Sequence, residues 1–118
     1  MYRISKIFTF EAAHYLPHVP PGHKCGQLHG HSYRLEIILQ GELDEEKGWV
    51  MDFSEIKKTI SPLLEILDHS CLNKIHGLEN PTSEIIAHWI WDRIKPQLPL
   101  LDEIIIWETA TSQCSYKG

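Results

Sequence analysis

The sequence predicts an α+β fold whose elements follow the order ββααββ. Two N-terminal segments alternate apolar and polar residues, two central segments repeat apolar residues at helical spacing, and the C-terminal segment is rich in β-branched residues. Strands and helices that are grouped in this way are typical of the α+β class. The length of 118 residues fits one domain, 1–118.

Two extended segments open the chain. Residues 2–14 alternate, with Phe8, Phe10, Ala12 and His14 on one side, until a loop rich in proline and glycine ends the pattern. A second strand is predicted from His31 up to the acidic, turn-like segment 41–48. Its alternate residues form one face: His31, Tyr33, Leu35, Ile37 and Leu39.

Two helices are predicted in the middle of the chain. The first begins at Asp52 as N-cap, with Glu55 three residues on as in a capping box, and ends near Asp68. Pro62 inside it should kink the helix or remove one hydrogen bond. The second covers residues 82–95 and stops before Pro96. Apolar residues follow helical spacing in both: Ile56, Ile60, Leu63, Leu64 and Leu67, then Ile86, Trp89, Ile90 and Ile94.

The C-terminal segment predicts a β-hairpin. Residues 103–109 are rich in β-branched side chains, and a polar turn separates them from a short strand at 114–116. The four predicted strands and two predicted helices complete the ββααββ order.

Composition excludes several classes of partner. The chain has 11 basic and 16 acidic residues, a net charge of −5, and no basic run interleaved with aromatic residues, so nucleic acid is not an expected partner. Its apolar stretches are too short to span a bilayer. Three cysteines and no signal-peptide pattern indicate reducing cytoplasm. Because so short a chain forms few deep grooves alone, a homo-oligomer is expected.

The segment from Cys25 to His31 predicts a metal site. His29 and His31 are two residues apart on an extended strand, so both project to one face, and Gly30 between them leaves room for an ion. His14 would supply a third imidazole if the two strands pair as a hairpin, which leaves the fourth position of a catalytic zinc open. His18 and His23 are alternative third ligands. Eight histidines in 118 residues also produce such a pattern by chance.

Other residues carry weaker signals. Three roles are open to Cys25: a fourth metal ligand, a thiolate activated by a nearby cation, or an inert buried thiol. Cys71 and Cys114 are expected to serve mainly in packing. Asp68 next to His69 can form a proton relay, although a protonated histidine at a helix C-terminus is the interpretation favoured by sequence alone. Glu108, on the apolar face of its strand, predicts a bound arginine or ligand.

Six motifs in order resemble the 6-pyruvoyltetrahydropterin synthase superfamily. The spacing of three residues between Cys25 and His29 is similar to that in its queuosine (7-deazaguanine) branch, the 6-carboxy-5,6,7,8-tetrahydropterin synthases. The motifs are Phe8-Thr-Phe-Glu-Ala-Ala-His14, Cys25-x-x-x-His29-Gly-His31, Trp49-x-x-Asp52-Phe53, Leu67-Asp68-His69 with Leu72-Asn73, Glu79-Asn-Pro-Thr-Ser-Glu84 and Trp107-Glu108-Thr109.

The resemblance implies a tunnelling fold (T-fold), with a four-stranded antiparallel sheet and two helices on one face. In such proteins trimers join their sheets into a barrel, and two trimers stack into a hexamer. Active sites then lie at subunit interfaces. Cys25 is therefore expected to meet Asp68 and His69 of another chain.

The resemblance also implies roles for residues and a reaction. Zn²⁺ would be held by His14, His29 and His31. Catalysis would use Cys25 as base, Asp68 and His69 as relay, and Glu108 as pterin anchor. Substrate contacts would include Lys24, Thr82 and Ser83, with His18, His23 and Lys74 as other candidates for the triphosphate.

The implied reaction converts 7,8-dihydroneopterin triphosphate to 6-carboxy-5,6,7,8-tetrahydropterin, releasing acetaldehyde and triphosphate, which makes the protein a carbon–carbon lyase. One alternative is a 6-pyruvoyltetrahydropterin synthase, which eliminates triphosphate only. Another is a non-catalytic metal- or pterin-binding oligomer, in which Cys25 closes the metal site.

Overall fold

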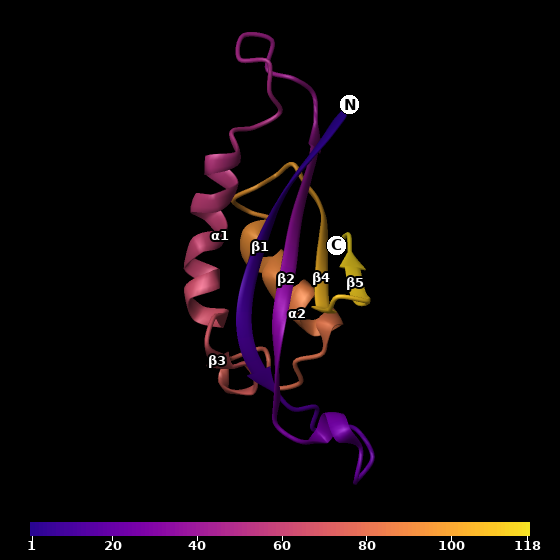
Figure 1. Cartoon of the computed structure of the whole chain (residues 1–118). Helices are drawn as coiled ribbons and strands as arrows, with labels where there is room; N and C mark the ends of the chain where they lie inside the picture. Colours follow the sequence, from indigo (N-terminus) through magenta and orange to yellow (C-terminus); the bar gives the residue numbers. More distant parts are fainter.

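One sheet and two helices form the architecture that a computed structural model describes for residues 1–118 (Figure 1). The α+β class predicted from the sequence is confirmed. The sheet has the strand order β3-β1-β2-β4-β5. The elements are β1 (Tyr2–His14), β2 (His29–Gly41), α1 (Phe53–Leu67), β3 (Ser70–Cys71), α2 (Ser83–Ile94), β4 (Leu101–Thr109) and β5 (Ser112–Tyr116), with short 3-10 turns at Lys24–Gly26 and Leu72–Lys74.

The long hairpin of β1 and β2 is the centre of the sheet. Its antiparallel register runs without a shift from the pair Tyr2 and Gly41 to the pair His14 and His29. Alternate residues of both strands are buried, and the rings of Phe10 and Tyr33 stack with centroids 4.9 Å apart. Both predicted strands are therefore present, although β2 begins two residues earlier than the alternation predicted.

Both helices cover the same face of the sheet (Figure 1). The Asp52 carboxylate caps α1 by accepting the Ser54 N–H at 2.9 Å, and the Thr82 hydroxyl caps α2 by accepting the Ile85 N–H at 3.2 Å. Glu55 does not complete a capping box, because its carboxylate pairs with Lys58. The core contains apolar residues of both helices and of strands β1, β2 and β4: Phe10, Tyr33, Leu35, Ile37, Leu39, Ile56, Ile60, Leu67, Ile86, Ile90, Ile104 and Ile106.

The sheet differs from the expected four antiparallel strands in one respect. A fifth strand, β3, follows α1 and pairs parallel to β1, with Ser70 opposite Ala12 and Cys71 opposite Ala13. Two residues are too few to show an alternating pattern, so the sequence did not reveal this strand. The C-terminal hairpin is confirmed, with β4 beginning at Leu101 and β5 at Ser112, each two residues before its predicted start.

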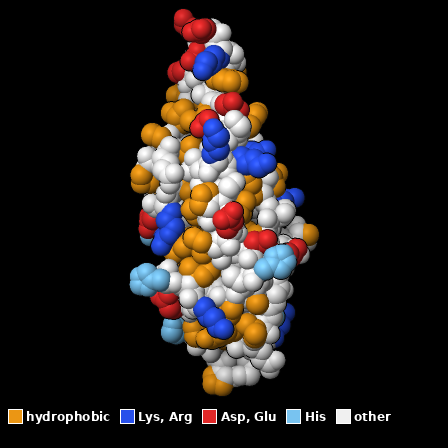
Figure 2. Space-filling model, turned by 90° about the vertical axis from the view of Figure 1, so that its left-hand side faces the viewer, with side chains coloured by type: hydrophobic (Ala, Val, Ile, Leu, Met, Phe, Trp, Pro, Cys, Tyr) orange, Lys and Arg blue, Asp and Glu red, His pale blue; other side chains and the backbone are white.

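The surface on the α1 side carries charges of both signs. Figure 2 shows acidic and basic side chains interspersed with apolar ones, and acidic side chains gather at the tip of the molecule. Neither helix combines the length and the apolar character that crossing a membrane requires.

Replacing Ile60 by alanine should lower the free energy of unfolding by about 2–5 kcal/mol, because this fully buried side chain would leave a cavity between α1 and the sheet. Urea denaturation of the purified protein measures the change. The matched control is Ile66→Ala on the exposed side of the same helix, where 50% of the residue is accessible and the expected loss is below about 0.5 kcal/mol. Equal losses in the two variants would contradict the proposed packing of α1.

Candidate active site

Three histidine side chains meet where the β1–β2 hairpin ends. His14, the last residue of β1, pairs with His29, the first residue of β2, and His31 lies opposite the small Ala12. The three ring centroids are 4.6 to 5.0 Å apart, and one nitrogen from each ring lies within 4.8 Å of the others. This cluster can hold a metal ion.

The hydrogen bonds of two rings determine which nitrogen can bind a metal. His14 Nδ1 lies 2.9 Å from the Pro81 carbonyl oxygen, and His29 Nδ1 lies 2.7 Å from the Gln27 carbonyl oxygen. A carbonyl only accepts, so each Nδ1 carries the hydrogen and each Nε2 keeps its lone pair. The Nε2 atoms of His14 and His31 are buried without a hydrogen-bond partner. The donor set therefore fits a metal ion, which would satisfy these lone pairs.

Burial disfavours the charged form of two of these rings. Only 1% of His14 is exposed, and loss of solvation lowers its pKa, although the hydrogen bond to Pro81 and the charge of Glu108 partly oppose the shift. Burial likewise lowers the pKa of His31, again opposed by Glu108. Because a metal binds the neutral imidazole, these shifts favour metal binding near neutral pH.

Gly30 does not make room for the ion as the sequence suggested. A β-carbon on Gly30 would meet only the Ala12 carbonyl oxygen, at an ordinary contact distance of 3.5 Å. Its position between His29 and His31 on an extended strand places it on the opposite face of the sheet. The small residue on the face of the histidines is Ala12, which lies across from His31.

A cavity of about 480 Å³ beside the cluster brings together several residues that the sequence singled out. Glu108 enters it from the end of β4, with Oε1 3.5 Å from His31 Nε2 and Oε2 accepting a hydrogen bond from the Ser83 hydroxyl at 3.4 Å. Cys25 faces the same space from the loop. The lining residues are Lys24, Cys25, His29, His31, Glu108, Thr109 and Ser112.

The backbone carbonyl and the backbone N–H of Cys25 both make hydrogen bonds that position its loop. The Cys25 carbonyl accepts the Leu16 N–H at 2.8 Å, and its N–H donates to His23 Nδ1 at 3.0 Å. His23 therefore caps the turn at Lys24–Gly26 and, like His18, lies outside the metal cluster. The sequence could not reveal that His23 caps this turn, because many side chains can cap a turn and no residue spacing is specific to that role.

The predicted relay pair is in contact and is anchored to β1. Asp68 Oδ2 lies 3.0 Å from His69 Nδ1, and Asp68 Oδ1 accepts the Glu11 N–H at 2.8 Å. The hydrogen bond from Glu11, followed by that from His69, lowers the pKa of the Asp68 carboxyl. His69 has a φ of +56°, and its N–H donates to the Glu11 carbonyl oxygen. The edge of the sheet thus holds the left-handed conformation of His69.

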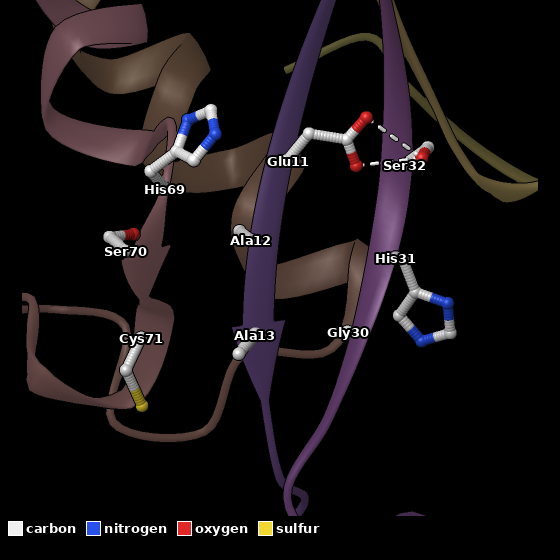
Figure 3. Close-up of a pocket in the computed structure, with 9 residues that line it drawn as sticks. All are labelled: Glu11, Ala12, Ala13, Gly30, His31, Ser32, His69, Ser70 and Cys71. Atoms are coloured by element: carbon white, nitrogen blue, oxygen red, sulfur yellow. Dashed lines mark hydrogen bonds between the residues drawn. The ribbon is translucent and has the colours of Figure 1, made fainter.

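The relay pair and Cys25 do not share a cavity within one chain. His69 lines a different cavity, of about 520 Å³, together with Glu11, Ser32 and Cys71. His31 lines both this cavity and the one that contains Cys25. Figure 3 shows His69 on one side of the β1–β2 hairpin and the His31 ring on the other. Neither Asp68 nor His69 lines the cavity that contains Cys25.

The remaining predicted substrate contacts have different positions. Lys24 lines the cavity with Cys25, and Ser83 contacts Glu108. The Thr82 hydroxyl caps α2, which uses one of its lone pairs. Lys74 and His18 do not line this cavity.

Comparisons with known proteins agree on one family. Residues 3–118 match the family model described as 6-pyruvoyl tetrahydropterin synthase. The chain is 43% identical over 122 residues to 6-carboxy-5,6,7,8-tetrahydropterin synthase of Synechocystis sp., covering 98% of this chain and 93% of that protein. It is 45% identical over 85 residues to dihydroneopterin monophosphate aldolase of Pyrococcus furiosus, covering 70% and 71%. The Caenorhabditis elegans 6-pyruvoyl tetrahydropterin synthase structure superposes with a TM-score of 0.91 at 28% identity, covering 99% and 95%.

The metal-free protein should lose stability as the pH falls below 6.5, the ordinary histidine pKa. The pKa values of His14 and His31 are lowered in the folded state, so the unfolded chain binds protons more readily below that pH. Above pH 6.5 the two rings are neutral in both the folded and the unfolded state, so their protonation no longer lowers the stability. Urea denaturation between about pH 8 and about pH 5 measures the effect. The exposed His18→Gln variant should keep the same pH dependence, and a flat profile in the parent protein would contradict the prediction.

Proposed function

The chain belongs to the 6-pyruvoyl tetrahydropterin synthase family, and we propose that it converts 7,8-dihydroneopterin triphosphate to 6-carboxy-5,6,7,8-tetrahydropterin. Acetaldehyde and triphosphate are the other products. The family assignment makes it a pterin-converting enzyme. The observation that supports the proposal most directly is the cavity in which Cys25 and Glu108 flank His29 and His31. The pathway would be queuosine biosynthesis in the cytoplasm, with residues 1–118 acting as one domain.

We propose Zn²⁺ as the metal of the histidine cluster. Three imidazoles and an open fourth position are the ligand set of catalytic zinc sites, and the Nε2 atoms of His14 and His31, which are buried without a hydrogen-bond partner, support it. When bound, Zn²⁺ supplies Lewis acidity toward the hydroxyl groups of the substrate side chain.

Glu108 is suited to bind the pterin ring. The 2-amino and N3–H groups of a pterin form a planar pair of donors, which two carboxylate oxygens can accept together. The Ser83 hydroxyl bonds one of these oxygens and restrains the orientation of the carboxylate. We further propose that Lys24 binds the phosphates and that Thr82 and Ser83 lie beside the ring.

Cys25 is the proposed base at the substrate side chain. It lines the cavity together with two of the proposed metal ligands, and a nearby cation favours the thiolate. His69, hydrogen-bonded to Asp68, would transfer protons at the opposite face of the substrate. The His69 side chain is 78% exposed and that of Asp68 is 43% exposed, and the pair lies outside the cavity that contains Cys25 of the same chain. These facts support a site shared between subunits of a homo-oligomer, for which we propose a dimer of trimers.

The relatives suggest two other reactions. Drosophila melanogaster 6-pyruvoyl tetrahydrobiopterin synthase is 38% identical over 104 residues, and the Pyrococcus furiosus relative is named as an aldolase of dihydroneopterin monophosphate. The identity to the Synechocystis protein over nearly the whole chain favours the carboxy product. A non-catalytic metal- or pterin-binding oligomer would require Cys25 to close the metal site.

Purified protein with zinc should release one acetaldehyde for each 7,8-dihydroneopterin triphosphate consumed, because the proposed reaction removes two carbons from the side chain. Alcohol dehydrogenase coupled to the assay measures the acetaldehyde, and chromatography identifies the pterin. A pyruvoyl product without acetaldehyde would assign the protein to the other synthase. Preferred turnover of the monophosphate would instead favour the aldolase reaction.

Cys25→Ala and His69→Ala should each abolish turnover and keep the zinc content, since neither residue belongs to the histidine cluster. When the two variants are co-expressed with different tags and purified as mixed oligomers, a site can take Cys25 from one chain and His69 from another. Random mixing should then restore about a quarter of the parental turnover.

The matched control for this experiment combines Cys25→Ala with Glu108→Ala. Both residues line the cavity of one chain, so mixing these variants should restore no activity. Absence of recovery with His69→Ala would contradict the shared site. Loss of zinc in Cys25→Ala would favour the non-catalytic oligomer.

A further inference from the structure

We propose that Asn73 is a positioning residue for the metal centre. Its side chain links the end of β1 to the segment that contains Pro81, and the hydrogen bond between His14 and Pro81 leaves His14 Nε2 free to bind metal. The inference rests on the metal centre of the proposed function. Asn73 lies in the 3-10 turn Leu72–Lys74, and its side-chain hydrogen bonds go to Tyr15 and Glu79, not to His14. It therefore acts through the backbone of other residues.

The Asn73 amide pairs with β1 just beyond its last residue. Its Oδ1 accepts the Tyr15 N–H at 3.0 Å, and its Nδ2 donates to the Tyr15 carbonyl oxygen at 2.8 Å. This pair of bonds resembles the contact that a neighbouring strand would make. Because Tyr15 follows His14 directly, the amide restrains the backbone from which the His14 ring projects.

The same side chain reaches a second segment. Asn73 Nδ2 also donates to the Glu79 carbonyl oxygen at 3.3 Å. Two residues later, the buried Pro81 carbonyl oxygen lies 2.9 Å from His14 Nδ1. Asn73 thus connects both sides of one contact: the backbone that carries the His14 ring and the segment that carries the carbonyl accepting its Nδ1–H.

A competing hydrogen bond explains why this contact requires support. The buried Tyr33 hydroxyl lies 3.3 Å from the same His14 Nδ1. If the Pro81 carbonyl moved away, that hydroxyl could donate to Nδ1, and the ring proton would then reside on Nε2. An Nε2–H cannot bind a metal. The link through Asn73 therefore favours the tautomer that the metal requires.

Two substitutions separate the bonds that Asn73 makes. Asn73→Ala removes all three, whereas Asn73→Asp keeps the acceptor for the Tyr15 N–H and places a carboxylate against two carbonyl oxygens. Both should weaken Zn²⁺ binding by about 10- to 100-fold, as is typical when the groups that orient a ligand are lost. Competition with a chromophoric chelator measures the affinity of the full chain. The matched control is Asn80→Ala. This variant removes a side-chain amide that makes no hydrogen bond and that lies next to Glu79, so it should bind Zn²⁺ as the parent protein does.

A second measurement distinguishes positioning from general destabilisation. Nitrogen-15 NMR of the metal-free protein reports which nitrogen of His14 is protonated, and the Nε2–H form should increase in the Asn73 variants but not in Asn80→Ala. If Asn73→Ala does not fold, Asn73→Asp decides by the same two measurements. Parental affinity together with an unchanged His14 tautomer would overturn the inference, as would a parent protein that binds no zinc. Weakened binding with the altered tautomer would support it even if the pterin assay failed, so the two proposals fail separately.

Discussion

The unbroken register between β1 and β2 is the constraint on which the candidate site depends. It places His14 opposite His29 and His31 opposite Ala12, all on the face that continues into the apolar core. A shift by one residue would move this whole set of side chains to the other face, because side chains alternate along a strand. The burial of Phe10 and Tyr33 further along the same face stabilises the register. Core packing and ligand placement are therefore specified by the same pairing.

Burial gives the histidine cluster its chemical character. Desolvation lowers the pKa values of His14 and His31, and carbonyl oxygens of Pro81 and Gln27 fix the tautomers of His14 and His29. In an apolar core such neutral rings with free lone pairs are unfavourable without a partner. These unfavourably buried lone pairs lie at the end of the hairpin, where a cavity opens beside the rings.

One face and one edge of the hairpin carry different parts of the proposed chemistry. Cys25 and Glu108 adjoin the histidines on the helix-covered face, whereas β3 and its neighbour His69 lie along the edge of β1 that faces away from β2. The Glu11 backbone orients both Asp68 and His69 through hydrogen bonds. This arrangement explains why one chain contains all the candidate groups without bringing them to one cavity, and it makes the assembly of chains part of the proposed active site.

The sequence alone determined the α+β class, the two helices and the pair of histidines on one strand, because alternation, caps and two-residue spacing are local properties. It did not reveal β3, whose two residues are too few for a pattern. The spacing of residues left His18 and His23 as alternatives to His14, and the tertiary structure shows that His14 is the one beside His29 and His31, because strand pairing is a long-range contact. The tertiary structure also decided that His23 caps the Cys25 turn and that Ala12, and not Gly30, is the small residue beside the site. Residue spacing reports which face a side chain occupies, whereas its neighbours across the sheet depend on how distant segments pack.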